Sequence, residues 1–513
     1  MDLSIKIGGE AGQGIQTIGD LLTKIFARTG FYVFTHQDYE SRVRGGHNFY
    51  QIRFSDKPVF ASRSQIDIIV GFDEDTITLH RHELKNSGIL IFDPTVVRQS
   101  YDDPQFLSVP FGKVAAESSG NAIMANTVAT GVILGMLGLP VEALADALPV
   151  TLKKKTEKNI ADNIAAAKRG YEYARKYCKN CVFSLSSRSE PLMSIDTNQA
   201  IGLGAGASGC KFYSAYPMTP STGIMTALAQ RSQEFGIIVE QAEDEIAAIN
   251  MAIGASFAGV RAMTGTSGGG FSLMVEGLSL AAMTETPIVI VLGQRPGPAT
   301  GLPTRTEQGE LLFALHAGHG EFPRIIFAPG TAEQACFLTN KAFDLSQKFQ
   351  IPVFILTDQY LADSQWTYKS LDSERLAFTN YRVVNIDEPG ERDYKRHALT
   401  ENGISPFAVP GKSRNLVITD SDEHDETGHI TEDAVIREKM VLKRNQKKIS
   451  DMLSHINPPD VYGAKNPEIV VTGWGSSYGI MREAVDMLSS SGKSIAALHF
   501  REIYPFPETR EFD

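Results

Sequence analysis

Residues 213–222 read Tyr-Ser-Ala-Tyr-Pro-Met-Thr-Pro-Ser-Thr, and this stretch decides how the centre of the chain folds. It follows a short run of β-favouring residues with two prolines, Pro217 and Pro220, three positions apart. Because proline fixes φ and restricts the residue before it, the pair holds Thr219 rigidly at the end of a strand. The stretch therefore predicts a strand-to-helix turn that presents a hydroxyl in a fixed place. Considered alone, an ordinary structural turn would look the same.

Helices and strands are expected to alternate after this turn. The pattern predicts helices at 221–235, 244–257, 271–284 and 332–348, and strands at 237–240, 261–265, 287–292 and 353–357. Such alternation favours a parallel sheet covered by helices on both faces, in which ligands bind outside the carboxyl ends of the strands. The chemically unusual residues follow those strand ends: Thr219, 241–243, 266–270, 294–295 and 358–360. Their common position predicts one site on the rim of the sheet.

Glu243 lies in the acidic segment 240–245, directly before a helix of small and apolar residues. A helix that is apolar all round is normally buried, so we expect Glu243 to be drawn toward the interior. A buried carboxylate needs a partner, and a ring nitrogen of a cofactor would serve. The alternative is a helix-terminal acid that faces water.

Two further segments favour a ligand site. The sequence Thr266-Ser-Gly-Gly-Gly270 allows a ligand to approach the backbone closely, although a tight turn would also account for it. Residues 293–310 form a long loop rich in proline, glycine and hydroxyls, and such loops inside compact domains are usually functional. Arg295 follows a strand directly, where its guanidinium could take a carboxylate through two hydrogen bonds.

The N-terminus predicts a separate anion-binding turn. A strand at 4–7 leads into Gly-Gly-Glu-Ala-Gly-Gln-Gly at 8–14 and then into a helix at 15–26. Strand, glycine loop and helix together present backbone N–H groups and a positive dipole end to an anion. A dinucleotide site is the alternative: Thr17 replaces its third glycine, but Asp38 stands near the position of a ribose-binding acid.

A second basic turn follows at residues 40–48, where Arg42 and Arg44 precede two glycines. It could face a phosphate or carboxylate, or it could be a solvated turn.

Composition narrows the class of protein. The 513 residues suggest about three domains. A net charge of −11 without a basic stripe argues against nucleic-acid binding.

Four cysteines are too few for a disulfide scaffold and suit a reducing cytoplasm. We interpret Cys178-x-x-Cys181 as incidental, so that this chain carries no metal cluster. No signal peptide is expected, and the uncharged run 121–141 is typical of a buried helix, which together predict a cytoplasmic protein.

The expected domain boundaries follow from these patterns. We predict an α/β domain at 1–183, a linker at 184–193, a second α/β domain at 194–375, an extended loop and long-helix region at 376–465, and the truncated start of a further domain at 466–513.

The long-helix region contains two features of its own. Residues 423–429 combine three acids with two histidines, which favours a polar loop facing a ligand or an interface over an irregular metal site. A charged helix at about 431–456 is expected to bury one apolar stripe: Val435, Leu442, Ile449, Leu453 and Ile456.

Six motifs together carry a resemblance to a known family. They are Tyr216-Pro-Met-Thr-Pro-Ser-Thr222, Gln241-Ala-Glu-Asp-Glu245, Thr266-Ser-Gly-Gly-Gly270, 294–304, Glu423-His-Asp-Glu426 and Gly473-Trp-Gly-Ser476. The sequence resembles the 2-oxoacid:ferredoxin (flavodoxin) oxidoreductases, specifically an α subunit with its γ domain fused at the N-terminus. Small departures from the family are Met218 for Ile, Gly269 for Pro, Pro296 for Gly and Ala299 for Ser.

The resemblance implies three α/β parts, each built on a parallel sheet: a γ-type domain on the coenzyme A side, a thiamine-diphosphate-binding domain of the pyrimidine type, and the start of a transketolase C-terminal-like domain. It implies thiamine-diphosphate-dependent oxidative decarboxylation of a 2-oxo acid to an acyl-CoA. Electrons would pass through iron–sulfur clusters to ferredoxin or flavodoxin.

The resemblance also implies roles for individual residues. Glu243 would hydrogen-bond the aminopyrimidine ring of the cofactor and favour its imino tautomer, as a form of general acid–base catalysis. Thr219 would orient the substrate, and Arg295 and Thr304 would bind its carboxylate. The other expected contacts are Thr266 and Ser267 for thiamine diphosphate, and Gly9, Gly12 and Gly14 for coenzyme A.

Part of the family's machinery is missing from this sequence. It has no Gly-Asp-Gly…Asn signature for magnesium and diphosphate and no cluster cysteines, so Mg²⁺ and [4Fe–4S] are expected on a β subunit. The chain would then be half an active site, inactive alone, and part of a higher oligomer of αβ units. The fused γ–α arrangement favours 2-oxoglutarate, with pyruvate and branched-chain or aryl 2-oxo acids left open. The alternatives are a non-redox thiamine-dependent decarboxylase or transketolase-like subunit, a nicotinamide dehydrogenase, and a catalytically dead scaffold.

Overall fold

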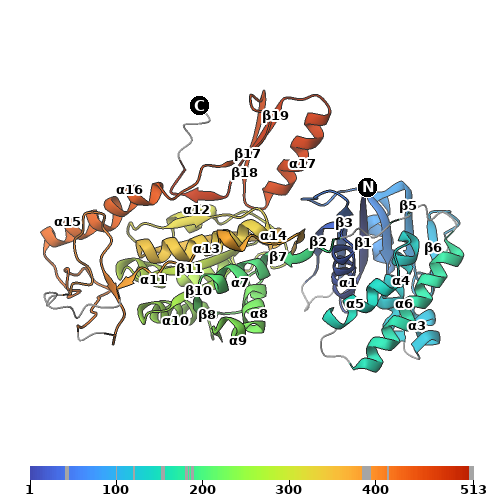
Figure 1. Ribbon diagram of the computed structural model, residues 1–513, viewed down its shortest axis with the longest axis horizontal. Coiled ribbons are helices and arrows are strands. Elements are labelled where there is room, and N and C mark those ends of the chain that lie inside the picture. Colours follow the sequence, from blue (N-terminus) through green and yellow to red (C-terminus); the bar gives the residue numbers. More distant parts are fainter. Residues whose placement is uncertain are drawn as a thin grey trace. The chain divides into compact units, whose positions relative to one another are not determined.

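The computed structural model describes residues 1–40, 46–99, 101–119, 122–151, 156–178, 183, 185, 190–383, 394–412 and 415–507. They form two compact units, one of Met1–Ile195 with Asp363–Leu371 and one of Asp196–Ala362 with Asp372–Asp513 (Figure 1). The expectations for Arg42, Arg44 and Cys181 concern residues outside this description.

The first unit is built on an eight-stranded sheet of mixed direction, in the order β6-β5-β4-β1-β3-β2-β14-β7. Its strands are β1 (Asp2–Glu10), β2 (Tyr32–Asp38), β3 (His47–Ser55), β4 (Ile66–Gly71), β5 (Leu84–Phe92), β6 (Phe106–Ser108), β7 (Met193–Asp196) and β14 (Gln365–Tyr368). Strands β6, β5, β4 and β1 are parallel, whereas β3 runs antiparallel to both β1 and β2. The parallel expectation fails there because the connection between β2 and β3 is too short for a crossover.

Strand β14 comes from residues that follow the second unit's sheet, which the sequence did not predict. Trp366 pairs with Phe34 of β2, and their rings pack edge to face with centroids 5.2 Å apart. The chain therefore returns to the first sheet after completing the second.

Helices of the first unit bury the faces that the sequence predicts. In α1, Ile15, Ile18 and Leu22 are buried, as are Ile25 and Phe26. Helix α4 is buried and packs against α6, where Gly131 and Gly170 let the two backbones approach closely. The helices are α1 (Ile15–Arg28), α2 (Glu74–His80), η1 (Arg81–Glu83), α3 (Phe111–Ser119), η2 (Ala122–Met124), α4 (Ala125–Leu137), α5 (Glu142–Thr151) and α6 (Glu157–Tyr177).

The second unit contains the predicted parallel sheet, in the order β20-β12-β13-β11-β10-β8-β9. Its strands are β8 (Cys210–Ala215), β9 (Ile238–Gln241), β10 (Arg261–Thr266), β11 (Ile288–Gln294), β12 (Ile325–Phe327), β13 (Pro352–Asp358) and the antiparallel edge strand β20 (Glu502–Tyr504). The central strands β10, β11 and β13 are buried along their whole length, which suits a sheet covered on both faces.

The helices beside this sheet begin and end near the predicted residues, with two differences. The expected helix 221–235 divides at Arg231 into α8 and α9, and α11 begins at Gly268 rather than at residue 271. Thr331 caps α13 by accepting from the Gln334 N–H at 3.1 Å. The helices are α7 (Thr197–Ala207), α8 (Thr222–Gln230), α9 (Ser232–Phe235), α10 (Glu245–Phe257), α11 (Gly268–Met283), α12 (Leu311–His316), α13 (Ala332–Phe349), α14 (Gln359–Asp363) and η3 (Ser373–Arg375).

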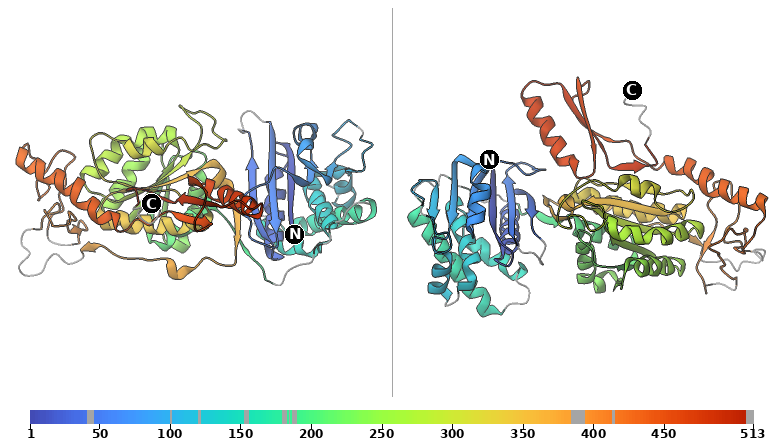
Figure 2. Two further views of the ribbon diagram at one scale, coloured as in Figure 1. Left: turned by 90° about the horizontal axis from the view of Figure 1, so that it is seen from above. Right: turned by 180° about the vertical axis from the view of Figure 1, so that it is seen from behind.

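The C-terminal part adds two short sheets and two sets of helices. Strands β15 (Arg382–Val383) and β16 (Phe407–Ala408) pair with each other, and β17 (Asp460–Gly463), β19 (Ile495–Phe500) and β18 (Ile469–Trp474) form a three-stranded sheet. Helix α17 (Ser477–Ser490) packs along that second sheet (Figure 2). The predicted long helix consists of α15 (Ala434–Leu442), a π-helical turn η4 (Lys443–Lys447) and α16 (Lys448–Leu453).

The apolar stripe of the long helix is buried only toward its C-terminal end, where Ile456 is 8% exposed and Ile449 and Leu453 are half-buried. Val435 is 57% exposed and Leu442 is 38% exposed, whereas Lys443 and Lys448 are fully buried. The cations face inward because they share one buried carboxylate, Glu285, which follows α11.

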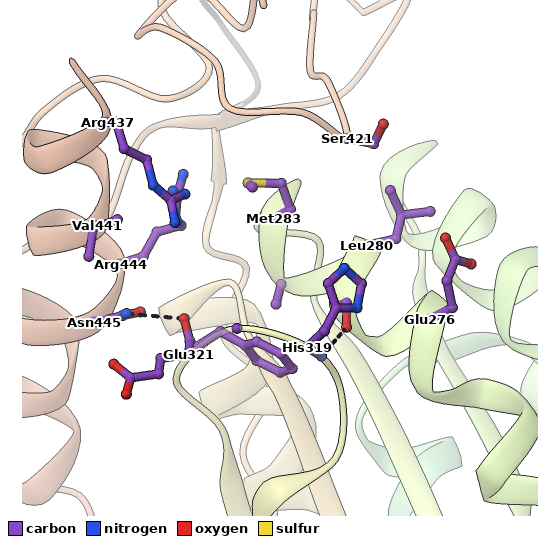
Figure 3. Close-up of a pocket in the computed structure, with 14 residues that line it drawn as sticks. Glu276, Leu280, Met283, His319, Glu321, Ser421, Arg437, Val441, Arg444 and Asn445 are labelled. Carbon is purple, nitrogen blue, oxygen red and sulfur yellow. Dashed lines mark hydrogen bonds between the residues drawn. The ribbon is translucent and has the colours of Figure 1, made fainter. Parts of the chain in front are cut away.

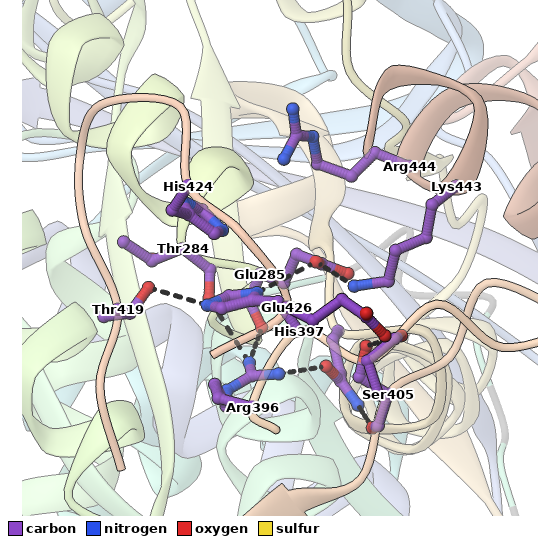
Figure 4. A network of polar contacts seen from close by, with 12 residues as sticks. Thr284, Glu285, Arg396, His397, Ser405, Thr419, His424, Glu426, Lys443 and Arg444 are labelled. Carbon is purple, nitrogen blue, oxygen red and sulfur yellow. Dashed lines mark hydrogen bonds and ion pairs between the residues drawn. The ribbon is translucent and has the colours of Figure 1, made fainter. Parts of the chain in front are cut away.

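Glu285 organises a buried polar cluster that joins distant segments (Figure 4). Its backbone has φ 50°, and its carboxylate accepts from Lys443 Nζ at 2.5 Å and from Lys448 Nζ. His397 Nδ1 lies 3.1 Å from the same carboxylate, and Arg396 donates to the Glu285 carbonyl at 2.7 Å. Burial alone would raise the pKa of Glu285, but Lys443 and Lys448 hold it well below its usual value.

The predicted polar loop 423–429 belongs to the same region. His424 is buried against His397 with ring centroids 4.0 Å apart, and Glu423 binds Arg437 and Arg444. Among the described residues, no group of three or more His, Cys, Asp or Glu side chains is arranged to hold a metal ion. The observed contacts of this loop are with α15, with η4 and with the segment around His397 of the same chain.

Within the described part of the chain, none of the helices combines the length and the apolar character that crossing a membrane requires.

Candidate functional site

The candidate site lies at the carboxyl edge of the second unit's parallel sheet. Strands β13, β11, β10, β8 and β9 are successive neighbours and end at this edge. The segments that follow them are those that the sequence predicted to share a rim. The parallel register thus explains why residues from five separate stretches gather in one region.

Arg295 and Thr219 are in direct contact. Arg295 leaves the end of β11 and is only 8% exposed, and its Nη1 donates to the Thr219 carbonyl oxygen at 2.8 Å. Burial lowers the pKa of Arg295, and the nearby Glu310 opposes this effect. One arm of the guanidinium is thereby fixed by the backbone of the proline-flanked turn.

The start of α11 presents buried polar atoms to the same edge. Thr266 and Ser267 are fully buried, and the Ser267 hydroxyl has no hydrogen-bond partner within the described ranges. Ser267 is the N-cap of α11, yet its side chain makes no capping bond. The first turn of α11 therefore has backbone N–H groups and a hydroxyl available to a ligand.

Glu243 does not lie where we expected. It is exposed, and the buried acid of the segment is Glu245, which has an unpartnered Oε1 among the described residues. The reason is the helix start: Asp244 caps α10 by accepting from the Ala247 N–H at 2.7 Å, which leaves Glu243 outside the helix. Burial raises the pKa of Glu245.

A cavity of about 600 Å³ opens beside Arg295 and the start of α11. Its lining includes Gly268, Arg295 and Glu310. Glu310 was not among the residues predicted from the sequence. Burial and the neighbouring Glu307 raise its pKa to about 7. The length of the loop 293–310 indicated a functional segment. No residue spacing in the sequence distinguishes Glu310 from the other polar residues of that loop.

Buried polar side chains at the strand ends form hydrogen bonds that hold the loops of the site in place. Gln294 accepts from the Glu310 N–H at 3.1 Å and donates to the Thr357 carbonyl at 3.2 Å. Asp358, at the end of β13, accepts from the Ser476 hydroxyl, and burial raises the pKa of Asp358. These contacts bring the Gly473–Ser476 motif to the same edge.

Thr304 stands apart from the other predicted residues. Its hydroxyl and carbonyl lie 3.4 and 3.5 Å from Arg305 Nη1. No hydrogen bond within the described part of the chain joins Thr304 to Arg295 or Thr219.

The glycine turn belongs to the first unit and has the predicted order of strand, loop and helix. Strand β1 extends to Glu10, so Gly8 and Gly9 lie in the strand and the turn proper is residues 11–14. Gly12 and Gly14 have φ of 96° and 78°, and Gly14 precedes α1 without a side-chain cap. The first amides of α1 are thus available to an anion.

The dinucleotide alternative for this turn does not fit the sheet. In that fold the first two strands are neighbours, whereas here β3 lies between β1 and β2. Asp38, at the end of β2, is therefore not in the position of a ribose-binding acid.

Comparison with known proteins agrees with this arrangement. Residues 204–443 match the family model described as pyruvate flavodoxin/ferredoxin oxidoreductase, thiamine diP-bdg, and residues 4–173 match that of pyruvate ferredoxin/flavodoxin oxidoreductase. The α subunit of a 2-oxoacid:ferredoxin oxidoreductase from a Sulfolobus species is 34% identical over 99% of this chain and 88% of that protein.

Two further relatives carry more specific names. The 2-oxoglutarate synthase subunit KorA of Methanocaldococcus jannaschii is 34% identical over 61% of this chain and 82% of its own length. A solved structure of 2-oxoglutarate:ferredoxin oxidoreductase from Magnetococcus marinus, with 2-oxoglutarate, coenzyme A and succinyl-CoA bound, is 32% identical. It covers 99% of this chain and 89% of that one, with a TM-score of 0.90.

The fold and the site define an α/β enzyme subunit with a thiamine-diphosphate-binding domain. The chain belongs to the 2-oxoacid:ferredoxin oxidoreductases, as an α subunit.

Proposed function

We propose that this chain, together with a β subunit, converts a 2-oxo acid and coenzyme A into an acyl-CoA and carbon dioxide. The reaction releases two electrons and a proton, and the electrons reduce ferredoxin or flavodoxin. The observation that carries this proposal is the buried Arg295, held by Thr219 beside a 600 Å³ cavity at the start of α11. A fixed guanidinium at the edge of a cavity is suited to a substrate carboxylate.

We favour 2-oxoglutarate as the substrate. The names of the Methanocaldococcus jannaschii and Magnetococcus marinus relatives support this choice. In this proposal Arg295 binds the carboxylate next to the 2-oxo group, Thr219 orients the carbonyl, and Thr304 supplies a further hydroxyl.

The residues at the start of α11 fit thiamine diphosphate. A Cβ at Gly270 would collide with Thr266 Oγ1 and Glu245 Oε1, so glycine preserves a close approach, and Ser267 Oγ is buried without a partner in the described residues. When bound, the cofactor supplies a nucleophilic carbon and an electron sink for decarboxylation. Glu243 would hold a proton at the cofactor's pyrimidine ring, and Thr266 and Ser267 would contact the cofactor.

The exposed position of Glu243 suits a site that is completed by a second chain. Ile246 and Met251 of α10 are 49% and 42% exposed, and Leu273 of α11 is also exposed. Neighbouring exposed apolar residues are typical of protein interfaces. We propose that a β subunit covers this region and contributes Mg²⁺ and a [4Fe–4S] cluster, within a higher oligomer of αβ units in the cytoplasm.

We assign each segment of the chain to one part of the family's domain architecture according to its place in the sequence. Residues 1–183 form the γ-type domain, where Gly9, Gly12 and Gly14 help to hold coenzyme A, and 184–193 form a linker. Residues 194–375, apart from β14 in the first sheet, form the thiamine-diphosphate domain, 376–465 the extended loop and long-helix region, and 466–513 a transketolase C-terminal-like part.

The test is 2-oxo-acid-dependent reduction of a viologen dye by the tagged chain, purified anaerobically with the proteins that accompany it. 2-Oxoglutarate, pyruvate and 2-oxoisovalerate are compared with and without coenzyme A. Coenzyme A-dependent reduction, fastest with 2-oxoglutarate, is expected. No reduction by a preparation that contains a cluster-bearing partner would contradict the proposal.

Arg295→Ala is expected to raise the KM for the 2-oxo acid by at least 10-fold and to leave the KM for coenzyme A within about twofold. The reason is the loss of a charge-assisted contact to the carboxylate, which contributes about 1.5–3 kcal/mol. Steady-state kinetics with each substrate varied in turn measures both constants. Arg375→Ala, an exposed arginine beside Phe337, is the control and should change neither. Equal increases in both constants would show that the arginine has a different role.

Glu310→Gln is expected to remove a pH dependence of substrate binding near pH 7. The Glu310 pKa of about 7 means that the carboxyl is neutral below pH 7 and becomes a competing anion beside Arg295 above it. In the wild type, the KM for the 2-oxo acid should therefore rise as the pH increases from 6 to 8. In Glu310→Gln it should stay at its low-pH value. Glu234→Gln, an exposed acid that does not line this cavity, is the control and should keep the wild-type pH dependence. A KM that rises equally in Glu310→Gln and in the control would contradict this role.

A further inference from the structure

A second cavity, of about 410 Å³, lies at the other end of α11. Its lining comes from the C-terminal half of α11, the segment 319–322 and the helices α15 and η4 (Figure 3). Helix α11 rises 1.5 Å per residue, so its end at Met283 is about 22 Å from Gly268 in the candidate active site. The two cavities share no lining residue.

One wall of this cavity carries two arginines. Arg444 Nη2 donates to both carboxylate oxygens of Glu423, at 3.0 and 2.8 Å, and Arg437 binds the same carboxylate. The Arg444 side chain is only 7% exposed, and its Nη1 has no hydrogen-bond partner within the described ranges. A buried guanidinium N–H without an acceptor costs free energy, which a bound anion would recover.

The π-helical turn η4 sets this geometry. Lys443 and Arg444 are consecutive and both buried, with Lys443 directed to Glu285 and Arg444 to the cavity. Asn445, the next residue, donates to the Glu321 carbonyl at 3.0 Å, and its Oδ1 is buried without a partner in the described chain. Single π-helical turns occur frequently at functional sites.

The remaining walls restrict the chemistry of the ligand. Leu280, Met283 and Val441 provide apolar surface, and Glu276 and His319 stand across from the arginines. The acids Glu276 and Glu321 in the lining repel a multiply charged phosphate more strongly than a single carboxylate, which the arginine wall can hold. The apolar residues would bury the body of such a ligand.

We propose that this cavity binds a small organic acid through one carboxylate on Arg444 and an apolar body on Leu280, Met283 and Val441. Arg437 adds charge at the rim. The site is separate from the 2-oxo acid site at Arg295, and its occupation does not depend on the proposed reaction.

Binding is tested with sodium hexanoate as the probe, using saturation-transfer NMR on the full chain together with its co-purified partner. Arg444→Lys keeps the positive charge but has one terminal nitrogen in place of Nη1 and Nη2, so it cannot serve Glu423 and the ligand as the guanidinium does, and it should weaken hexanoate binding at least 10-fold. Val441→Phe fills the cavity without changing charge and should also prevent binding. Arg295→Ala should leave it unchanged, because the carboxylate site there is a different one.

Each outcome decides the proposal. Binding that is lost in Arg444→Lys and Val441→Phe but kept in Arg295→Ala supports it. The proposal is overturned if binding is lost only in Arg295→Ala or is equal in all variants. It is also overturned if no binding is detected at hexanoate concentrations 10-fold above the expected millimolar range. Inorganic phosphate and acetate are compared with hexanoate: tighter binding of phosphate would overturn the monocarboxylate assignment, and equal binding of acetate would overturn the apolar part. Thermal unfolding midpoints confirm that the variants are folded, and if Arg444→Lys is not, Val441→Phe carries the test.

Discussion

Glu243→Gln is expected to lower turnover by about 10²–10⁴-fold while leaving subunit assembly and stability unchanged. Glutamine keeps the shape of the side chain but cannot accept and return a proton at the position that the cofactor's ring would occupy. Stability should change by less than about 0.5 kcal/mol, because Glu243 is exposed and makes no hydrogen bond within the described residues.

The measurement combines the viologen assay with size-exclusion chromatography of the co-purified complex. Glu240→Gln is the matched control, since Glu240 is also an exposed acid on the same segment and should retain full activity. Near-wild-type turnover of Glu243→Gln would refute the cofactor assignment and redirect attention to the buried Glu245.

Glu285→Gln is expected to lower the free energy of unfolding by about 3–5 kcal/mol, the usual cost of removing one partner of a buried ion pair. Lys443 and Lys448 would remain buried with no anion between them. Because the pKa of Glu285 is depressed in the folded state, its contribution is present above pH 4.5 and is lost as the pH falls through the folded-state pKa. The loss should therefore be largest near neutral pH.

Urea denaturation gives the free energy, and hydrogen exchange of residues 434–453 shows whether α15 and α16 loosen first. Glu276→Gln, an exposed acid on α11, is the control and should cost less than 0.5 kcal/mol. Combining Glu285→Leu with Lys443→Met and Lys448→Met should recover most of the lost stability, since apolar groups of similar volume can replace a buried ion cluster. A stable Glu285→Gln protein would show that the lysines find other partners.

The sequence predicted the rim of the parallel sheet well because strand order follows from alternation and the rim follows from strand direction. Arg295 and Thr219 meet there although 76 positions separate them. The start of α13 was also predictable, because its cap is a local contact between Thr331 and the N–H of Gln334, three positions later.

Predictions failed where burial depends on distant partners. The apolar positions of α10 predicted a helix buried all round, yet Ile246 and Met251 are exposed, because periodicity does not distinguish a chain's own core from a surface that another chain can cover. The burial of Lys443 and Lys448 could not be predicted, because nothing near them in sequence indicates Glu285, more than 150 positions earlier. Strand β14 was missed because four residues carry too little pattern to indicate a return to the first sheet.

The three consecutive glycines at the start of α11 differ sharply in what surrounds them. A Cβ at Gly268 would strike Glu310, and one at Gly270 would strike Thr266 and Glu245, whereas one at Gly269 would lie 3.4 Å from the Ala299 carbonyl oxygen, an ordinary contact. In a library randomised over residues 268–270 and selected for enzyme activity, codons 268 and 270 should return to glycine. Codon 269 should accept other residues. The family's usual proline at position 269 fits this tolerance, so three identical letters in the sequence encode two fixed positions and one replaceable one.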